Sequence, residues 1–193
     1  LVRNVANAVE VAEGVDYVTG KANDPRLHDV TMSLAGELLA LSGLAVSATA
    51  GRAKAEAPLD DGRPAEVFGH MVAALGGPKD FITRSGAYLI PAPVIRPCFA
   101  TRAGRLARID ARAIGVAVVT LGGGRSRAED AIDPRVGFTG VLGLGETAGP
   151  DRPLATVHAA SETDADSACA ELRLAFTLGD AAVIGQSVLE RGR

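Results

Sequence analysis

Residues 109–133 read IDARAIGVAVVTLGGGRSRAEDAID, in which an apolar segment runs into three glycines, two arginines at alternate positions and a spaced pair of aspartates. Residues Ala111–Leu121 predict a helix, and the glycine triplet is placed to end it. Glycine loses more conformational entropy on folding than other residues do. Consecutive glycines are therefore expected where side chains do not fit or where φ must be positive. We therefore expect a helix that ends in a tightly packed turn.

Short strands are expected on both sides of this helix. Pro91, Pro93 and Pro97 impose extended geometry on the chain that precedes it. Val94–Ala100 and Gly104–Ile109 then read as two strands paired across a turn at Arg102–Gly104. Later in the chain, two further strands are expected, at Val136–Leu144 and Leu154–Ala159. A final helix should begin at Thr163, and its buried face should carry Ala168, Leu172, Ala175 and Phe176.

Upstream of Pro91 the pattern is helical. Asn7 is a good N-cap with Glu10 three residues later, a reciprocal capping arrangement, and Gly20 is placed to end this first helix. A second helix should begin near Pro25, end at Gly43 and carry an inward apolar stripe. That stripe comprises Leu27, Val30, Leu34, Leu38 and Leu41. Two shorter helices are expected over Ala48–Ala57 and Pro64–Leu75. The sequence thus predicts an α+β protein, with a helical segment over residues 1–90 and a compact α+β domain over residues 91–193.

Composition narrows the class of protein. The chain has 193 residues, 47% of them hydrophobic, and a formal net charge of −3. It has no basic surface that would indicate nucleic-acid binding, and no apolar run of roughly 18 residues that would span a bilayer. We expect a cytoplasmic protein whose two cysteines, Cys98 and Cys169, are buried and reduced. The first residue is Leu1 rather than Met, which suggests a fragment or a processed product.

Several local patterns suggest chemistry but do not establish it. Gly122–Arg127 could hold an anion through backbone N–H groups and guanidinium charge, although the spacing is not that of a phosphate-binding P-loop. Gly143–Ala148 fits the dinucleotide pattern G-x-G-x-x-A, but Gly149-Pro150 follows at once and prevents the helix that such a site needs. Asp110, Asp130 and Asp133 suit turns and helix starts. The three histidines have no neighbouring metal ligand at a suitable spacing.

The chain resembles the later part of thymidine phosphorylase and its pyrimidine-nucleoside phosphorylase relatives. The resemblance rests on residues 109–133 and on further motifs that occur in family order over nearly the whole chain. These are Asn7-Ala8-Val9-Glu10-Val11-Ala12-Glu13, Asp24-Pro25-Arg26-Leu27, Ala65-Glu66-Val67-Phe68, Met71-Val72-Ala73-Ala74, Val136-Gly137-Phe138-Thr139, and Pro153-Leu154-Ala155 with His158-Ala159. It implies a helical segment of the family's large α/β domain followed by a C-terminal α/β-hammerhead domain, which is barrel-sandwich-like.

The resemblance also implies a function. The complete enzyme would be a homodimer that catalyses reversible phosphorolysis of a pyrimidine nucleoside, with nucleoside and phosphate as its substrates and no organic cofactor. The family's phosphate loop and base-binding residues lie upstream of Leu1, so we assign no catalytic or substrate-binding residue and expect this chain alone to be inactive.

Two sites come from the resemblance alone. It implies a cleft-closure loop at Gly122, Gly123, Gly124 and Arg125, facing the domain that grips the pyrimidine. It also implies a bound K⁺, held by the backbone carbonyls of Leu1 and Asn4 and by the carboxylate of Glu13. This sequence departs from the family pattern at Ala6, where a glycine is usual, and at Asn4, where a smaller residue is usual.

The alternative is a non-catalytic interaction module. The short strands and glycine turns of Gly104–Ile109 and Val136–Ala159 suit a barrel-sandwich fold like those of biotinyl and lipoyl carriers. A carrier needs a lysine on an exposed hairpin, and the chain has no lysine after Lys79. This excludes the carrier function but leaves a docking role open.

Overall fold

The computed structural model describes residues 3–180. These residues form two compact units, one of residues 3–11 with 89–180 and the other of residues 12–88. Residues 3–11 belong with the later residues because Val5 and Phe138 exchange backbone hydrogen bonds of 2.9 and 3.0 Å. Helix α1 (Asn7–Val18) begins in the first unit and ends in the second. The architecture is α+β, as the sequence predicts.

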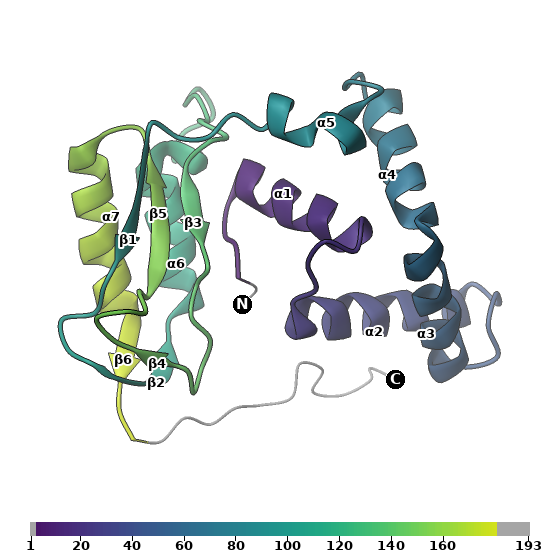
Figure 1. Ribbon diagram of the computed structural model, residues 1–193, viewed down its shortest axis with the longest axis horizontal. Helices are drawn as coiled ribbons and strands as arrows, with labels where there is room; N and C mark the ends of the chain where they lie inside the picture. The colour runs from purple at the N-terminus through teal and green to yellow at the C-terminus, as the bar shows by residue number, and fades with distance from the viewer. Residues whose placement is uncertain (1–2, 181–193) are drawn as a thin grey trace. The chain divides into compact units, whose positions relative to one another are not determined.

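The first unit contains two small antiparallel sheets (Figure 1). In one, β5 (Ala155–Ala159) lies between β1 (Val94–Cys98) and β3 (Gly137–Thr139). In the other, β2 (Gly104–Ile109) lies between β4 (Thr147–Ala148) and β6 (Phe176–Leu178). The predicted pairing of Val94–Ala100 with Gly104–Ile109 is therefore wrong. The alternate residues of β5 are fully buried, which makes it a central strand, and β1 pairs with it instead.

Two helices cover the β1-β5-β3 sheet of this unit, α6 (Ala111–Val118) and α7 (Glu162–Ala175) (Figure 1). Asp110 caps α6 by accepting from the Ala113 N–H at 3.0 Å, and Ser161 rather than Thr163 caps α7. The core between helices and sheets contains fully buried large side chains, among them Leu106, Ile114, Phe138, Leu154 and Leu172. Burial of this apolar surface is the main term that stabilises the unit.

The second unit is entirely helical over residues 12–88. After the end of α1 it contains α2 (Pro25–Leu41), α3 (Ala48–Glu56), a short 3₁₀ turn (Ala57–Asp61), α4 (Arg63–Ala74) and α5 (Phe81–Tyr88). Asp24 caps α2 by accepting from the Arg26 and Leu27 N–H groups, and Gly43 follows its end with φ 73°. Helices α2 and α3 cross at Gly36 and Gly51, where a Cβ on Gly36 would lie 2.6 Å from the Ala48 carbonyl oxygen.

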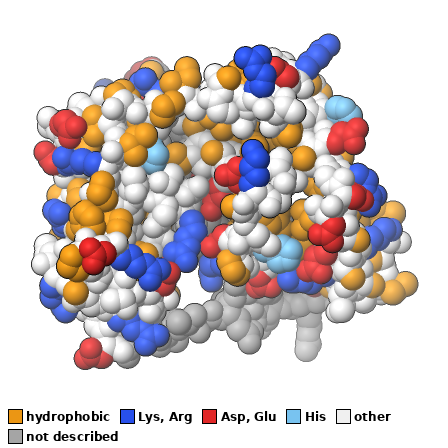
Figure 2. Space-filling view, in the orientation of Figure 1, with side chains coloured by type: hydrophobic (Ala, Val, Ile, Leu, Met, Phe, Trp, Pro, Cys, Tyr) orange, Lys and Arg blue, Asp and Glu red, His pale blue; other side chains and the backbone are white. Residues whose placement is uncertain are grey.

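The close crossing decides which face of α2 is buried. Met32 and Gly36 face α3, and the leucines that the sequence predicts to lie inward are exposed, Leu34 and Leu38 by 68% and Leu41 by 80%. The predicted inward stripe is therefore wrong in its later half. Helix α4 likewise exposes Val67, Met71 and, just beyond its end, Leu75. Apolar side chains are plainly visible among the charged ones on the molecular surface (Figure 2).

A polar network ties α1, α2 and α3 together. The Tyr17 hydroxyl lies 2.9 Å from Nδ1 of His28, and Arg52 bonds both Asp29 and Glu56, at 2.9 and 2.8 Å. Burial, with a smaller contribution from the charge of Glu56, raises the pKa of Tyr17. Over residues 3–180, no helix combines the length and apolar character needed to cross a membrane.

Candidate functional site

The glycine triplet forms a wide turn at the end of α6. Residues Val119–Gly123 continue the helix with π-type hydrogen bonding, and Gly122 breaks it with φ 91°. Gly123 is buried, and a Cβ added there would lie 2.7 Å from Cγ1 of Val118 and 3.2 Å from Cγ2 of Val136. Each of the two glycines is therefore required for a different reason. Gly122 adopts a positive φ, and Gly123 lies where a side chain would not fit.

Three residues hold the loop that follows. The side chain of Asn7 donates to the Gly123 carbonyl at 2.7 Å, and the backbone N–H of Asp133 donates to the Gly122 carbonyl at 2.9 Å. The Asp130 carboxylate accepts from the N–H groups of residues 126 and 127, at 3.0 and 2.8 Å. These contacts fix the end of the helix, while Arg125 stays exposed and donates through Nε to the Asp130 carbonyl.

The contact from Asn7 changes the interpretation of the first helix. Asn7 is the first helical residue rather than the N-cap, and the N-cap position belongs to Ala6, whose φ is 128°. The predicted reciprocal cap is half present, since Glu10 Oε1 accepts from the Ala6 N–H at 3.0 Å. The predicted N-cap role of Asn7 is wrong because its side chain reaches 116 residues along the chain to the glycine turn.

The aspartates of this region have structural partners. The Asp133 carboxylate forms two hydrogen bonds with the Arg135 guanidinium, at 2.8 and 2.7 Å, and these bonds hold the pKa of Asp133 below its ordinary value. Asp110 caps α6 and Asp130 closes the loop. Each of these three carboxylates therefore stabilises local structure.

Glu146 occupies the turn that formally matches the dinucleotide pattern. Its carboxylate pairs with Arg3 and with Arg152 and accepts from the Gly143 N–H. Burial alone would raise the pKa of Glu146, but the hydrogen bonds from Arg3 and Gly143 and the charges of Arg3 and Arg152 outweigh it, so the pKa is lowered. No helix starts here, and the turn joins β4 to the rest of the unit.

The predicted K⁺ ligands are placed as follows. Leu1 lies outside the described residues. Asn4 lies in the first unit, where its side chain donates to the Val9 carbonyl and accepts from the Gly140 N–H, both at 3.3 Å. Glu13 lies on α1 within the second unit. Residues 3–180 contain no group of three or more His, Cys, Asp or Glu side chains suited to a metal ion. The K⁺ site stays a prediction.

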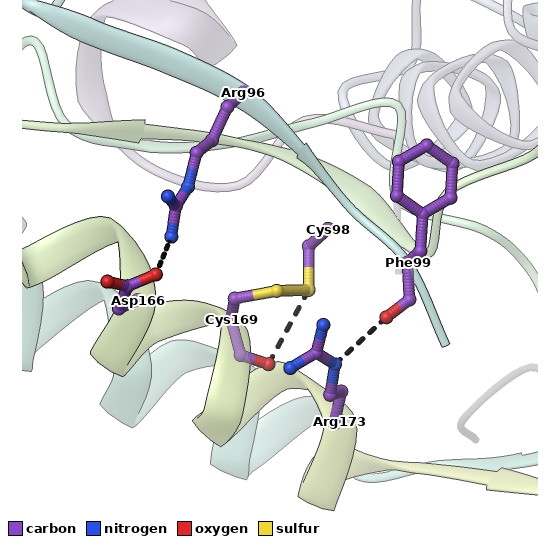
Figure 3. Close-up of a disulfide and its surroundings, with 6 residues drawn as sticks. All are labelled: Arg96, Cys98, Phe99, Asp166, Cys169 and Arg173. Carbon is purple, nitrogen blue, oxygen red and sulfur yellow. Dashed lines mark hydrogen bonds and ion pairs between the residues drawn. A yellow bond between two sulfur atoms is a disulfide. The ribbon is translucent and has the colours of Figure 1, made fainter. Parts of the chain in front are cut away.

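The two cysteines form a disulfide, so the expectation of reduced cysteines is wrong. Cys98 at the end of β1 joins Cys169 on α7, with a Cα–Cα distance of 5.5 Å (Figure 3). Both residues are buried. One turn further along α7, Arg173 donates to the Phe99 carbonyl at 2.9 Å, so two successive links tie the helix to the strand end. The signal in the sequence was an even number of cysteines, one in a strand and one on the buried face of a helix.

One comparison with known families bears on this unit. Residues 105–179 match the family described as the pyrimidine nucleoside phosphorylase C-terminal domain. The matched stretch runs from β2 to the end of β6, and it includes the glycine turn, the turn of Glu146 and helix α7. The comparison therefore supports the pyrimidine nucleoside phosphorylase family at the level of this C-terminal domain, residues 105–179.

Proposed function

We propose that this chain is the C-terminal part of a thymidine, or more broadly a pyrimidine-nucleoside, phosphorylase. In the complete enzyme, phosphate attacks C1′ of thymidine and the glycosidic bond breaks, which yields thymine and 2-deoxyribose 1-phosphate. The complete enzyme would act as a cytoplasmic homodimer. In that compartment, burial of Cys98 and Cys169 shields the disulfide from thiols.

The observation that carries this proposal is the family domain at residues 105–179. The helical unit supports it independently. Residues 12–88 contain helices and no strand, and α2 and α4 expose leucines, a valine and a methionine that a sheet would normally cover. In an α/β domain, helices of the outer layer pack their apolar faces against the sheet. Helices whose apolar faces are uncovered are therefore expected when that sheet is absent.

The proposal gives this chain a positioning role. The transition state of phosphorolysis develops positive charge on the sugar, so the reaction depends on a phosphate placed against C1′ and on stabilisation of the departing base. Those contacts are proposed to come from upstream of Leu1. The turn at Gly122, Gly123, Gly124 and Arg125 would close the cleft, with exposed Arg125 as its contacting side chain and water excluded on closure.

An activity assay tests the proposal. The purified chain should show no phosphorolysis of thymidine, and a longer protein that adds the upstream half should release thymine only when phosphate is present. Uridine, assayed in parallel, would define the base preference. Turnover by the chain alone, after a control preparation from cells that lack it, would contradict our placement of the active site. A longer protein that folds but shows no turnover would favour the interaction module instead.

A further inference from the structure

A pocket of about 250 Å³ opens beside the disulfide in the first unit. Its apolar floor includes Leu154 and Phe176, both buried, and its rim carries Thr101, Arg102, Arg173 and Thr177, all exposed. The pocket has room for several waters or for a small organic molecule.

Two guanidinium groups of the rim have no acidic partner among residues 3–180. Arg102 donates through Nη2 to the Leu178 carbonyl at 3.2 Å, and Arg173 donates through Nε to the Phe99 carbonyl at 2.9 Å. Within residues 3–180 neither guanidinium has a carboxylate within 4.0 Å, whereas Arg52, Arg96 and Arg135 each pair with an acidic side chain. Each hydrogen bond to a carbonyl uses one N–H group and orients the guanidinium. The remaining N–H groups of each guanidinium are left to donate to a ligand.

The walls that present these groups are firmly connected. Arg173 lies one turn beyond Cys169 on α7, and the disulfide joins that helix to the end of β1 (Figure 3). The Leu154 N–H donates to the Cys98 carbonyl at 2.8 Å, so the floor is attached to the same strand end. A binding site whose walls are linked in this way loses little conformational entropy when it takes up a ligand.

We propose that this pocket binds a small organic phosphate, with the phosphate between Arg102 and Arg173 and the organic group on Leu154 and Phe176. A phosphate monoester carries close to two negative charges at neutral pH and matches two planar guanidinium forks better than a carboxylate does. The two threonine hydroxyls of the rim can add hydrogen bonds. The existence of this site does not depend on the proposed function.

Calorimetric titration of the full chain with phenyl phosphate at pH 8 tests the proposal. Saturable binding is expected, and Arg102→Gln or Arg173→Gln should each weaken it by about tenfold, since each loses charge-assisted hydrogen bonds. Arg105→Gln is the matched control. Arg105 also donates through Nε to a carbonyl, that of Gly145 at 2.8 Å, but it does not line the pocket. This variant should bind as the parent does, and thermal melts should show all three variants folded.

Two further ligands define the chemistry. Benzyl alcohol, which has the ring without the charge, should not bind measurably, and inorganic phosphate should bind more weakly than phenyl phosphate. Absence of saturable binding by phenyl phosphate, or equal weakening by Arg105→Gln, would overturn the proposal. Equal affinity for inorganic phosphate would overturn its organic part and leave a simple anion site.

Discussion

Ala6 and Gly137 lie closer together than two side chains could, because a Cβ built on Gly137 would stand 2.6 Å from the Cβ of Ala6. The contact follows from the pairing of the neighbouring residues, Val5 with Phe138. Both backbones have positive φ, 128° for Ala6 and 150° for Gly137. Gly137 adopts its conformation without strain, whereas Ala6 does not.

Ala6→Gly should therefore stabilise the protein. Relief of a strained positive φ should stabilise the folded state by roughly 1–3 kcal/mol. The greater conformational freedom of glycine in the unfolded chain should reduce this stabilisation by about 0.4–1 kcal/mol. Denaturant unfolding should show a higher midpoint. Ala8→Gly, two residues on and within α1, should lower the midpoint instead. If both variants lose stability, the strain at Ala6 is absent.

Gly123→Ala should destabilise the first unit by about 1–3 kcal/mol, the usual cost of an extra methyl group in a packed site. The added carbon would meet Val118 and Val136 in the buried turn. The control is Gly115→Ala in α6, where the added carbon meets nothing within 4 Å and helix propensity improves. Thermal melts of the two variants should shift in opposite directions.

The same variant tests the closure role in the complete enzyme. At a temperature where Gly123→Ala is fully folded, we expect kcat to fall, because a displaced turn closes the cleft less well. Unchanged kcat and KM, together with a lower Tm, would limit the turn to a structural role.

Reduction of the disulfide should destabilise the chain. The two cysteines are separated by 71 residues, and closing a loop of that length in the unfolded chain is worth about 4 kcal/mol in the chain-entropy model. Unfolding in guanidinium chloride should shift to a lower midpoint when a reductant is added. A double variant with Cys98→Ala and Cys169→Ala should be insensitive to the reductant. A parent protein that melts identically with and without reductant would contradict the prediction.

Acidification should destabilise the protein through His158. Burial lowers the pKa of His158 below its ordinary value of 6.5, so the unfolded chain binds the proton more readily than the folded chain. The free energy of unfolding should therefore decrease as the pH falls below about 6.5 and be regained above that value. His158→Gln should flatten this dependence, whereas His70→Gln, at an exposed position, should preserve it. Equal slopes for the parent and His158→Gln would show that other groups cause the loss.

The K⁺ site can be tested through stability in the complete enzyme. Glu13→Gln removes the only side-chain charge assigned to the ion, so added K⁺ should raise the Tm of the parent more than that of the variant. Measurements at constant ionic strength, with Na⁺ in place of K⁺, separate specific binding from screening. Identical K⁺ dependence in parent and variant would show that Glu13 is not a ligand.

Local signals in the sequence predicted local structure well. The start of α2 at Pro25, its stop at Gly43 and the bounds of β2 all appear as expected, because each depends on a few adjacent residues. Contacts between distant residues were not predictable in the same way. The exposed leucines of α2, the partner of β1, the reach of Asn7 to Gly123 and the disulfide all depend on residues that only the folded chain brings together.

The bond between Cys98 and Cys169 has a topological consequence for the exposed loop at residues 125–129. The backbone from β1 to α7 and the two sulfur atoms form one covalent ring, and this loop, with Arg125 and Arg127, lies on it. A protease that cuts after either arginine opens the ring without releasing a fragment, since the two new pieces stay joined through sulfur. The nicked protein therefore keeps its mass, apart from the water added at the cut, until a reductant separates the pieces.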